Sequence, residues 1–216
     1  MTDRTPHEHS GTTPWTETDW DERYAGAEQI WSGEPNGALV AEVSALAPGR
    51  ALDVGCGEGA DALWLAARGW EVTALDVSRV ALERAARAAD RAGVAVTWVH
   101  AGLVEAALVE GVLPAGAYDL VSAQYPALLR TPDRAAERAL LGAVAPGGTL
   151  LVVHHDVLDG QAHGFDPADY VLPAVVAELL DDRWQVEVDE RRDRHVSGGA
   201  GAHHTADLVL RARRLR

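Results

Sequence analysis

Three closely spaced glycines and two acidic residues form the pattern in this sequence that most clearly implies chemistry. Gly55, Gly57 and Gly59 follow a short apolar run. Asp53 lies within that run, and Asp76 closes the next one, 21 residues beyond Gly55. Glycines at such a turn allow positive φ and let a ligand approach the backbone, and a carboxylate ending the second strand can hold both hydroxyls of a ribose. The spacing therefore indicates a ligand that contains adenosine.

The glycines alone do not identify that ligand. The first two, together with Ala60, also satisfy the G-x-G-x-x-G/A fingerprint of dinucleotide-binding domains. Such domains place a pyrophosphate at the N-terminus of the following helix, whereas Asp53, Glu58 and Asp61 in this loop would oppose its charges. A ligand with a sulfonium and an ammonium group suits the loop better. Cys56, inside the loop, is expected to be a small apolar filler.

Polar residues end two later apolar runs. Gln124 and Tyr125 follow one of them, and His154, His155 and Asp156 follow the other. Ligands of open α/β sheets bind beyond the carboxyl ends of the strands, so these positions are candidates to face a substrate. Because histidine titrates near neutral pH, His154 is a candidate general base, and Tyr125 is the second candidate catalytic residue. The alternative for His154 is a structural hydrogen-bond donor at a strand end.

The elements that position these residues alternate between strands and helices. A short helix within residues 16–31 and an amphipathic helix over 37–47 come first, and then strand-length apolar runs alternate with segments of helical spacing. This order predicts a doubly wound α/β fold with a seven-stranded, mostly parallel sheet. The last two runs have no helix between them and predict an antiparallel hairpin with a long loop. We expect strands at 51–54, 71–77, 94–100, 118–124, 149–155, 184–192 and 205–213, and helices at 61–69, 79–91, 134–144 and 173–180.

Composition excludes several classes of function. The chain has 216 residues, enough for one domain, and 33 acidic against 19 basic residues give a formal charge of -14, which would repel nucleic acid. Arginine supplies all of those basic residues, so no Walker-type or Schiff-base lysine is present. A single cysteine, the lack of a leader-like segment and the lack of a membrane-length apolar run predict a cytoplasmic protein with no membrane partner. Residues 1–14 show no periodicity and are expected to form a disordered tail.

Four stretches of the chain are organised as in a known family: LDVGCGEGADALWLA, VTALDVS, YDLVSA and LLGAVAPGGTLLVV. They resemble the first, second and fourth motifs, and the turn before the fifth strand, of class I S-adenosylmethionine-dependent methyltransferases, in particular the small tellurite-resistance and thiopurine-type enzymes. The terminal hairpin is also similar, because the sheet of that family ends with an inserted reversed strand. The resemblance implies one Rossmann-like methyltransferase domain over residues 15–213, with S-adenosyl-L-methionine as its cofactor.

The resemblance also implies a set of cofactor contacts. In the family the glycine loop holds the methionine part, the acidic residue after the second strand binds the ribose, and the loop after the third strand contacts adenine. The family often has an acidic residue where this chain has Gly102, which leaves a backbone N–H to serve the adenine. By similarity the cofactor-binding residues are Asp53, Gly55, Cys56, Gly57, Gly59, Asp76, Val77, Gly102, Leu103, Ala123 and Trp31.

Aromatic residues precede the first strand, where related enzymes place a lid over cofactor and substrate. Trp15, Trp20, Tyr24 and Trp31 lie in this region, so residues 15–47 are expected to form a helical lid. An aromatic face can attract a sulfonium by a cation–π interaction of about 0.5–2 kcal/mol. By resemblance Trp31 faces the cofactor and Tyr24 the substrate, whereas Trp15 and Trp20 are equally well explained as anchors of the N-terminal helix.

Two histidine pairs raise the question of a metal. His154 and His155 form one pair, and His203 and His204 form the other, with Asp156 nearby in sequence. Neighbours on a strand point to opposite faces, so each pair offers at most one ligand to a given site. No metal is therefore predicted.

These observations lead us to expect a monomeric methyltransferase acting on a heteroatom of a small molecule. A soft acceptor such as a thiolate or selenide needs little beyond positioning, whereas a hydroxyl or amine benefits from a base worth roughly 10²- to 10⁴-fold. The family likeness favours a chalcogen acceptor, and the candidate substrate-facing residues are Tyr24, Gln124, Tyr125 and His154. Two alternatives remain open: an NAD(P)-dependent oxidoreductase and a non-catalytic S-adenosylmethionine-binding protein.

Overall fold

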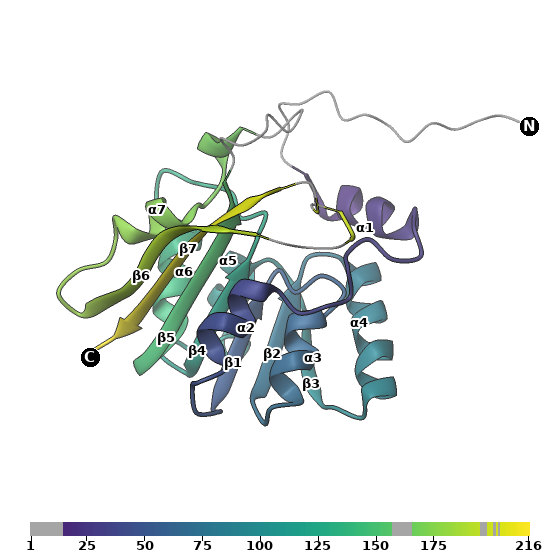
Figure 1. The fold of residues 1–216 in the computed structure, drawn as a ribbon, viewed down its shortest axis with the longest axis horizontal. Coiled ribbons are helices and arrows are strands. Elements are labelled where there is room, and N and C mark those ends of the chain that lie inside the picture. Colours follow the sequence, from purple (N-terminus) through teal and green to yellow (C-terminus); the bar gives the residue numbers. More distant parts are fainter. Residues whose placement is uncertain (1–14, 157–165, 195–197, 201, 203) are drawn as a thin grey trace, which may run out of the picture.

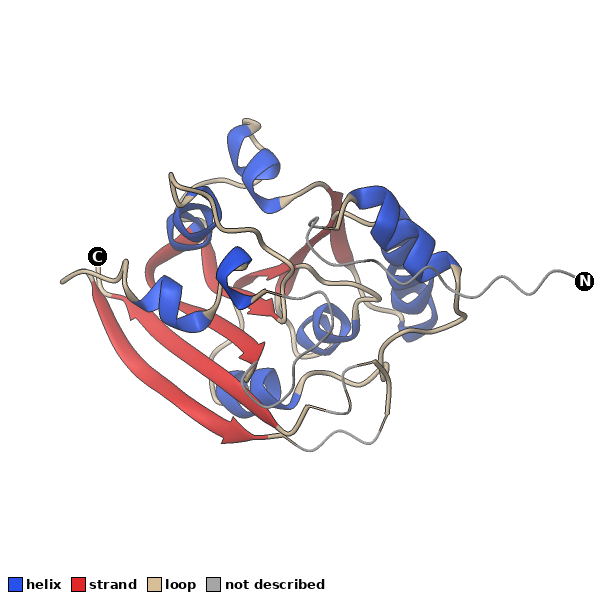
Figure 2. Ribbon diagram, turned by 90° about the horizontal axis from the view of Figure 1, so that it is seen from above, coloured by secondary structure: helices blue, strands red, loops and turns tan. Residues whose placement is uncertain are grey.

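The computed structural model describes residues 15–156, 166–194, 198–200, 202 and 204–216, and the tail predicted for residues 1–14 lies outside them. Within this part of the chain, a twisted sheet lies between two layers of helices (Figures 1 and 2). No described helix combines the length and the hydrophobicity needed to cross a bilayer.

The sheet has seven strands in the order β3-β2-β1-β4-β5-β7-β6. The first five are parallel, and β7 runs antiparallel between β5 and β6, which confirms the predicted fold and its terminal hairpin. Because the order reverses at β1, a crevice is expected at the carboxyl ends of β1 and β4, where ligands of such sheets bind. The strands are β1 (Arg50–Val54), β2 (Glu71–Asp76), β3 (Val96–His100), β4 (Tyr118–Gln124), β5 (Val144–His155), β6 (Trp184–Asp193) and β7 (Ala206–Arg214).

Two hydrophobic cores fill the spaces between the sheet and its helices. Leu120 and Leu151 pack with α2 and α3 on one face, whereas Val121 and Leu150 pack with α5, α6 and α7 on the other. Consecutive strand residues therefore alternate between the two cores. The helices are α1 (Glu17–Ala25), α2 (Gly37–Val43), α3 (Ala60–Ala66), α4 (Arg79–Ala92), α5 (Leu103–Leu108), α6 (Ala135–Ala143), the short 3-10 helix η2 (Pro167–Asp169) and α7 (Pro173–Ala177).

Helix boundaries follow local chemistry. α1 begins after Thr16, whose side chain caps the Asp19 N–H while the Asp19 carboxylate accepts from the Thr16 N–H at 2.7 Å. α2 ends at Val43, with Ser44 as its C-cap, short of the expected residue 47. α5 was not predicted, since six residues are too few to show a helical period.

Candidate active site

The glycine loop joins β1 to α3 and is held by hydrogen bonds to β2. The Gly55 N–H donates to the Leu75 carbonyl at 2.9 Å, and the Gly57 N–H donates to Asp76 Oδ2 at 2.8 Å. The φ angles of Gly55, Gly57 and Gly59 are 71°, 52° and 85°, in the left-handed region that other residues rarely adopt. This loop conformation therefore depends on glycine at all three positions.

Asp76 ends β2 beside this loop and is buried. Its second carboxylate oxygen accepts from the Ser78 N–H at 2.8 Å. Burial raises the pKa of Asp76 above its usual range, and the bonds from Ser78 and Gly57 oppose that rise. Each carboxylate oxygen keeps a further lone pair, so the group can still accept from the hydroxyls of a ribose.

Asp53 lies buried at the carboxyl end of β1 and is only 2% exposed. Among the described residues, its Oδ2 has no hydrogen-bond partner. Burial, followed by the charges of Asp61 and Asp76, raises the pKa of Asp53 well above its usual range. A buried carboxylate oxygen without a partner is costly, and the ammonium group of a ligand would satisfy it.

The other two acids of this region hold the N-terminal segment. Glu58 accepts from the Trp31 N–H at 3.0 Å, and Asp61 accepts from the backbone and side-chain nitrogens of Asn36 at 2.7 and 2.8 Å. Both carboxylates are thus directed at residues 30–36. These bonds do not remove the negative charge of Asp61, whereas Arg84, 2.8 Å from Glu58, offsets that of Glu58, so Asp53 and Asp61 remain the acids that would oppose a pyrophosphate.

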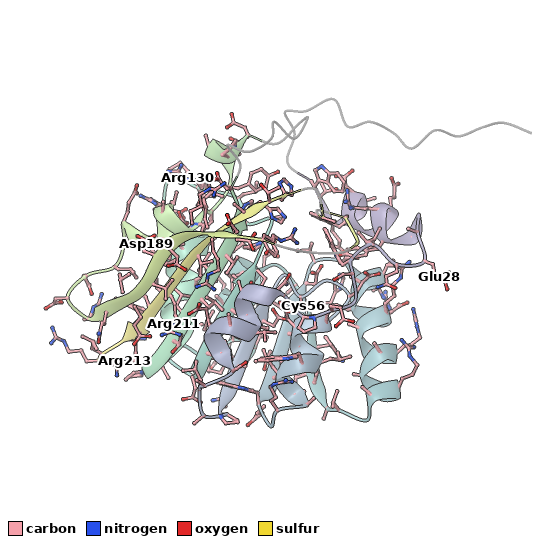
Figure 3. The ribbon with its side chains drawn as sticks, viewed as in Figure 1. Glu28, Cys56, Arg130, Asp189, Arg211 and Arg213 are labelled. Carbon is pink, nitrogen blue, oxygen red and sulfur yellow. The ribbon has the colours of Figure 1, made fainter. Side chains whose placement is uncertain are left out.

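Tyr24 and Trp31 lie over the glycine loop. The Trp31 Nε1–H donates to Tyr24 Oη at 2.9 Å. A Cβ atom on Gly57 would lie 2.9 Å from Tyr24 Oη and 3.2 Å from Trp31 Nε1, so both side chains touch the loop. Trp15 and Trp20 instead contact each other as a tilted pair, with ring centroids 4.8 Å apart and an interplanar angle of 50°. Figure 3 shows Cys56 of the loop at the end of the sheet that the N-terminal segment covers.

The start of α5 contributes an acidic group that the sequence analysis missed. The Gly102 N–H donates to Glu105 Oε2 at 3.0 Å, and a side chain on Gly102 would collide with that carboxylate. Leu103 is buried beside it, and Val77 lies next to Gly102. The Glu105 carboxylate thus lies against Gly102, the position after β3 where the similar family often has an acidic residue. Glu105 lies in the first turn of α5, a short helix that the sequence did not predict.

The end of β4 brings polar side chains onto the face covered by α2 and α3. Asp53 pairs with Ser122 across β1 and β4, and Gln124 lies two residues further on the same face. The Gln124 Nε2–H donates to Ser122 Oγ at 3.0 Å, whereas its buried Oε1 has no partner within the described chain. Ala123, between them, packs into the opposite core. An unpaired buried amide oxygen is available to a ligand.

An aromatic stack forms where β4 and β5 end. The Tyr125 ring lies 4.1 Å from the His155 ring, which in turn lies 3.9 Å from the His204 ring, with interplanar angles of 22° and 13°. Tyr125 Oη donates to Asp207 Oδ2 on β7 at 2.8 Å, and burial raises the pKa of this phenol. The structure thus joins Tyr125, a predicted candidate, to three residues that the sequence analysis left without a catalytic role.

His154 and His155 point to opposite faces of β5. His154 lies on the face of α5, α6 and α7, where burial lowers its pKa from 6.5 to about 4. His155 follows Val153 by two residues and therefore shares the face of Gln124, the register partner of Val153. The sequence analysis favoured His154, whereas counting the strand period from Val153 selects His155 as the histidine on the Asp53 face.

The remaining candidates are Cys56 and the second histidine pair. Burial, followed by the charges of Asp53 and Asp76, raises the pKa of the Cys56 thiol well above its usual range, so it stays protonated. His203 lies outside the described residues. Within the described ranges, no three His, Cys, Asp or Glu side chains are grouped to hold a metal ion.

Part of the chain matches a known protein family. Residues 51–148 match the family described as a methyltransferase domain. Over 103 residues the chain is 41% identical to an uncharacterized methyltransferase of Mycobacterium tuberculosis, a match that covers 47% of this chain and 48% of the relative. The chain therefore spans about half the length of the curated relatives that it matches.

Two solved structures share the fold across most of the chain. One, from work on the conversion of a disulfide bond into a thioacetal group during echinomycin biosynthesis, has a TM-score of 0.71 and 22% identity, and the match covers 92% of both chains. The other is the N-methyltransferase NodS of Bradyrhizobium japonicum with bound S-adenosylhomocysteine, with a TM-score of 0.68 and 20% identity over 93% of this chain and 100% of NodS. These likenesses show a common fold.

Proposed function

Since residues 51–148 belong to the methyltransferase domain family and the sheet has the class I fold, we propose that this protein is an S-adenosyl-L-methionine-dependent methyltransferase. Its acceptor is a heteroatom of a small molecule. It works as a cytoplasmic monomer.

The observation that carries the proposal is the meeting of Asp76, Gly57 and Trp31 at the carboxyl end of β1. Asp76 and the Gly57 amide lie 2.8 Å apart, and the Trp31 indole lies over the same glycine. A carboxylate suits the ribose of the cofactor, and an aromatic face suits its sulfonium through cation–π attraction. The unpartnered Oδ2 of Asp53 suits its ammonium group.

The cofactor contacts proposed here follow the course of the chain around the site. The loop of Asp53, Gly55, Cys56, Gly57 and Gly59 holds the methionine part, Asp76 with Val77 holds the ribose, and Gly102 with Leu103 borders the adenine. Glu105 is added to this set because its carboxylate lies against Gly102. Ala123 and Trp31 complete the cofactor site, while Tyr24, Gln124 and Tyr125 face the acceptor.

The chemistry asked of this site is mainly positioning. Methyl transfer from a sulfonium is an in-line displacement, so acceptor and methyl carbon must be held about 3 Å apart with water excluded. Tyr24 is 3% exposed and Gln124 is 7% exposed, which supports a largely dry enclosure.

Thermal unfolding with four ligands tests the proposal. S-adenosylmethionine, S-adenosylhomocysteine, NAD and NADH are each added well above a plausible Kd. Binding at 100 times the Kd adds about 2.7 kcal/mol and raises Tm by several degrees. We expect the two adenosyl ligands alone to raise Tm.

The two alternatives give different outcomes. A rise with the nicotinamides alone contradicts the proposal and indicates an oxidoreductase. Binding of the adenosyl ligands with no release of S-adenosylhomocysteine across an acceptor screen indicates a binding protein without catalysis.

A further inference from the structure

Asp207 and His155 lie opposite each other on adjacent strands. They are register partners in the antiparallel pair β5–β7, and His155 Nδ1 lies 3.5 Å from Asp207 Oδ1, an ion-pair distance without a hydrogen bond between the two atoms. Asp207 is buried, and it also accepts the Tyr125 hydroxyl and lies 3.6 Å from Arg194 Nε. One buried carboxylate thus contacts an imidazole, a phenol and a guanidinium. Ordinary strand pairing does not require such a group.

The imidazole of His155 is held on both faces. Tyr125 stacks on one face and His204 on the other, as described above. Tyr125 has a φ angle of 52°, in the left-handed region, where a non-glycine residue costs about 1–2 kcal/mol. This conformation ends β4 and lets the ring stack on His155. The two ring stacks therefore fix the plane of the imidazole.

The cluster borders the proposed cofactor site. The Cα atom of Pro126, next to Tyr125, lies 3.8 Å from the position that a Cβ on Gly55 would occupy. On the other side, the Ala200 N–H donates to the Ile30 carbonyl at 2.9 Å, where the β6–β7 connection meets the N-terminal segment (Figure 1). The His155 side chain is 16% exposed, so it is not fully sealed in the core.

We propose that His155 is the general base of methyl transfer, that Asp207 is the residue that positions it, and that the acceptor is an alcohol, a phenol or an amine. This inference rests on the methyltransferase activity proposed above. A thiolate or selenide acceptor is already ionised, so its methylation does not require a general base. An alcohol, a phenol or an amine must lose a proton, and a histidine beside a buried carboxylate can accept it. The site therefore favours a protic oxygen or nitrogen over the chalcogen that family likeness suggested.

A bond forms between the acceptor oxygen or nitrogen and the methyl carbon, while the sulfur–methyl bond breaks and leaves its electron pair on sulfur. The acceptor proton moves to His155 Nε2, because Nδ1 is buried 3.5 Å from Asp207 Oδ1. The imidazolium releases that proton to water after the product leaves. The products are a neutral thioether, the methylated acceptor and one proton.

Charged groups on several elements act on the proton affinity of His155. Asp207 favours the imidazolium, whereas Arg194 disfavours it. Replacing Asp207 by Asn removes the favourable charge and keeps the unfavourable one, so the pKa of His155 should fall. Among the described residues, the titratable and charged groups of this cluster include Asp207 on β7, Arg194 after β6, Tyr125 after β4, His204 before β7 and His154 on β5.

The first test measures S-adenosylhomocysteine release from S-adenosylmethionine with catechol, benzylamine or thiophenol as the acceptor. With catechol or benzylamine, we expect His155→Gln to lower kcat by about 10²- to 10⁴-fold and to leave the Kd of S-adenosylhomocysteine unchanged. We expect Asp207→Asn to move the acidic limb of the pH–rate profile to lower pH. The matched control Asp189→Asn removes an exposed carboxylate of β6 (Figure 3) and should change neither quantity.

Two results of this assay overturn the proposal. One is turnover confined to thiophenol. The other is an unchanged kcat for His155→Gln with catechol or benzylamine.

A second test needs no acceptor. Proton NMR of the full chain follows the histidine ring signals with pH. We expect the His155 signal to titrate at lower pH in Asp207→Asn than in the wild type or in Asp189→Asn, and an unshifted signal overturns the pairing. If the wild type fails to bind S-adenosylhomocysteine, the proposed function is contradicted. The titration of the free protein still reports on His155, so the two failures are distinguishable.

Discussion

Trp31 Nε1 donates to Tyr24 Oη at 2.9 Å directly over Gly57. Both residues belong to the N-terminal segment, and their side chains lie against Gly57 of the glycine loop. The Gly57 amide in turn donates to Asp76. The segment, the loop and the carboxylate at the end of β2 therefore form one connected unit. Changes at any of the three should be felt at the cofactor site.

Gly57→Ala should damage both stability and cofactor binding. The added methyl would lie 2.9 Å from Tyr24 Oη, and the φ angle of 52° disfavours alanine. We expect a loss of about 1–2 kcal/mol in the free energy of unfolding and a weaker Kd for S-adenosylhomocysteine. Gly142→Ala is the control, because nothing lies within 4 Å of its Cβ position and alanine favours a helix. Equal effects of the two substitutions would contradict this account of the loop.

Trp31→Phe tests the aromatic contact with the cofactor. Phenylalanine cannot donate to Tyr24, and its ring attracts a cation less strongly than an indole does. We expect the binding free energy of S-adenosylmethionine, measured by calorimetry, to become less favourable by about 0.5–2 kcal/mol. The change should be smaller for S-adenosylhomocysteine, whose sulfur is uncharged. Trp64→Phe, at a tryptophan of α3 that stacks under Arg68, serves as the control. An equal loss for both ligands would argue against a sulfonium contact.

Glu58→Gln should loosen the N-terminal segment. The Glu58 carboxylate accepts from the backbone amides of Ile30 and Trp31 and pairs with Arg84 at 2.8 Å. A neutral amide weakens these charge-assisted bonds. We expect faster hydrogen exchange at the Ile30 and Trp31 amides while exchange in β1 stays unchanged. Glu83→Gln, at an exposed position on α4, should leave both regions as they are. An unaltered exchange rate in Glu58→Gln would contradict the role of this carboxylate in holding the N-terminal segment.

His154 should make the protein less stable in mild acid. Its pKa is lowered by burial from 6.5 in the unfolded chain to about 4 in the folded one, so the folded state favours the neutral ring. This contribution is fully present above pH 6.5 and is lost as the pH falls from there toward 4, by an amount on the order of 3 kcal/mol. Denaturant unfolding at a series of pH values measures it. The fall should be smaller in His154→Gln, and the same pH dependence in both proteins would contradict the assignment.

The sequence was sufficient to predict what depends on local pattern. Alternating apolar runs gave the strands and the terminal hairpin, and the glycines with Asp76 marked the turn that the structure places at the end of β1. These features are carried by short runs of the chain and by the spacing between them. The length of α2 and the presence of α5 were missed because short helices carry little periodic signal.

The residues around the acceptor were harder to predict because they meet only through the sheet. Asp207 reaches His155 through the register of β5 with β7, across 51 residues that include a long connection. The choice between His154 and His155 depends on which face of β5 meets α2 and α3, and that becomes clear only when the strand is in place. Glu58 likewise seemed a ligand-facing charge until its contact with Trp31 was known.

Calorimetric titration of S-adenosylhomocysteine into the wild type and Asp76→Asn tests the central claim most directly. Loss of the carboxylate should weaken the hydrogen bonds to the ribose, each worth about 1.5–3 kcal/mol when charged, so we expect a Kd at least about tenfold higher. Asp90→Asn, at an exposed position of α4, should bind like the wild type. No binding heat with the wild type, or equal affinity in Asp76→Asn, would contradict the cofactor site proposed here.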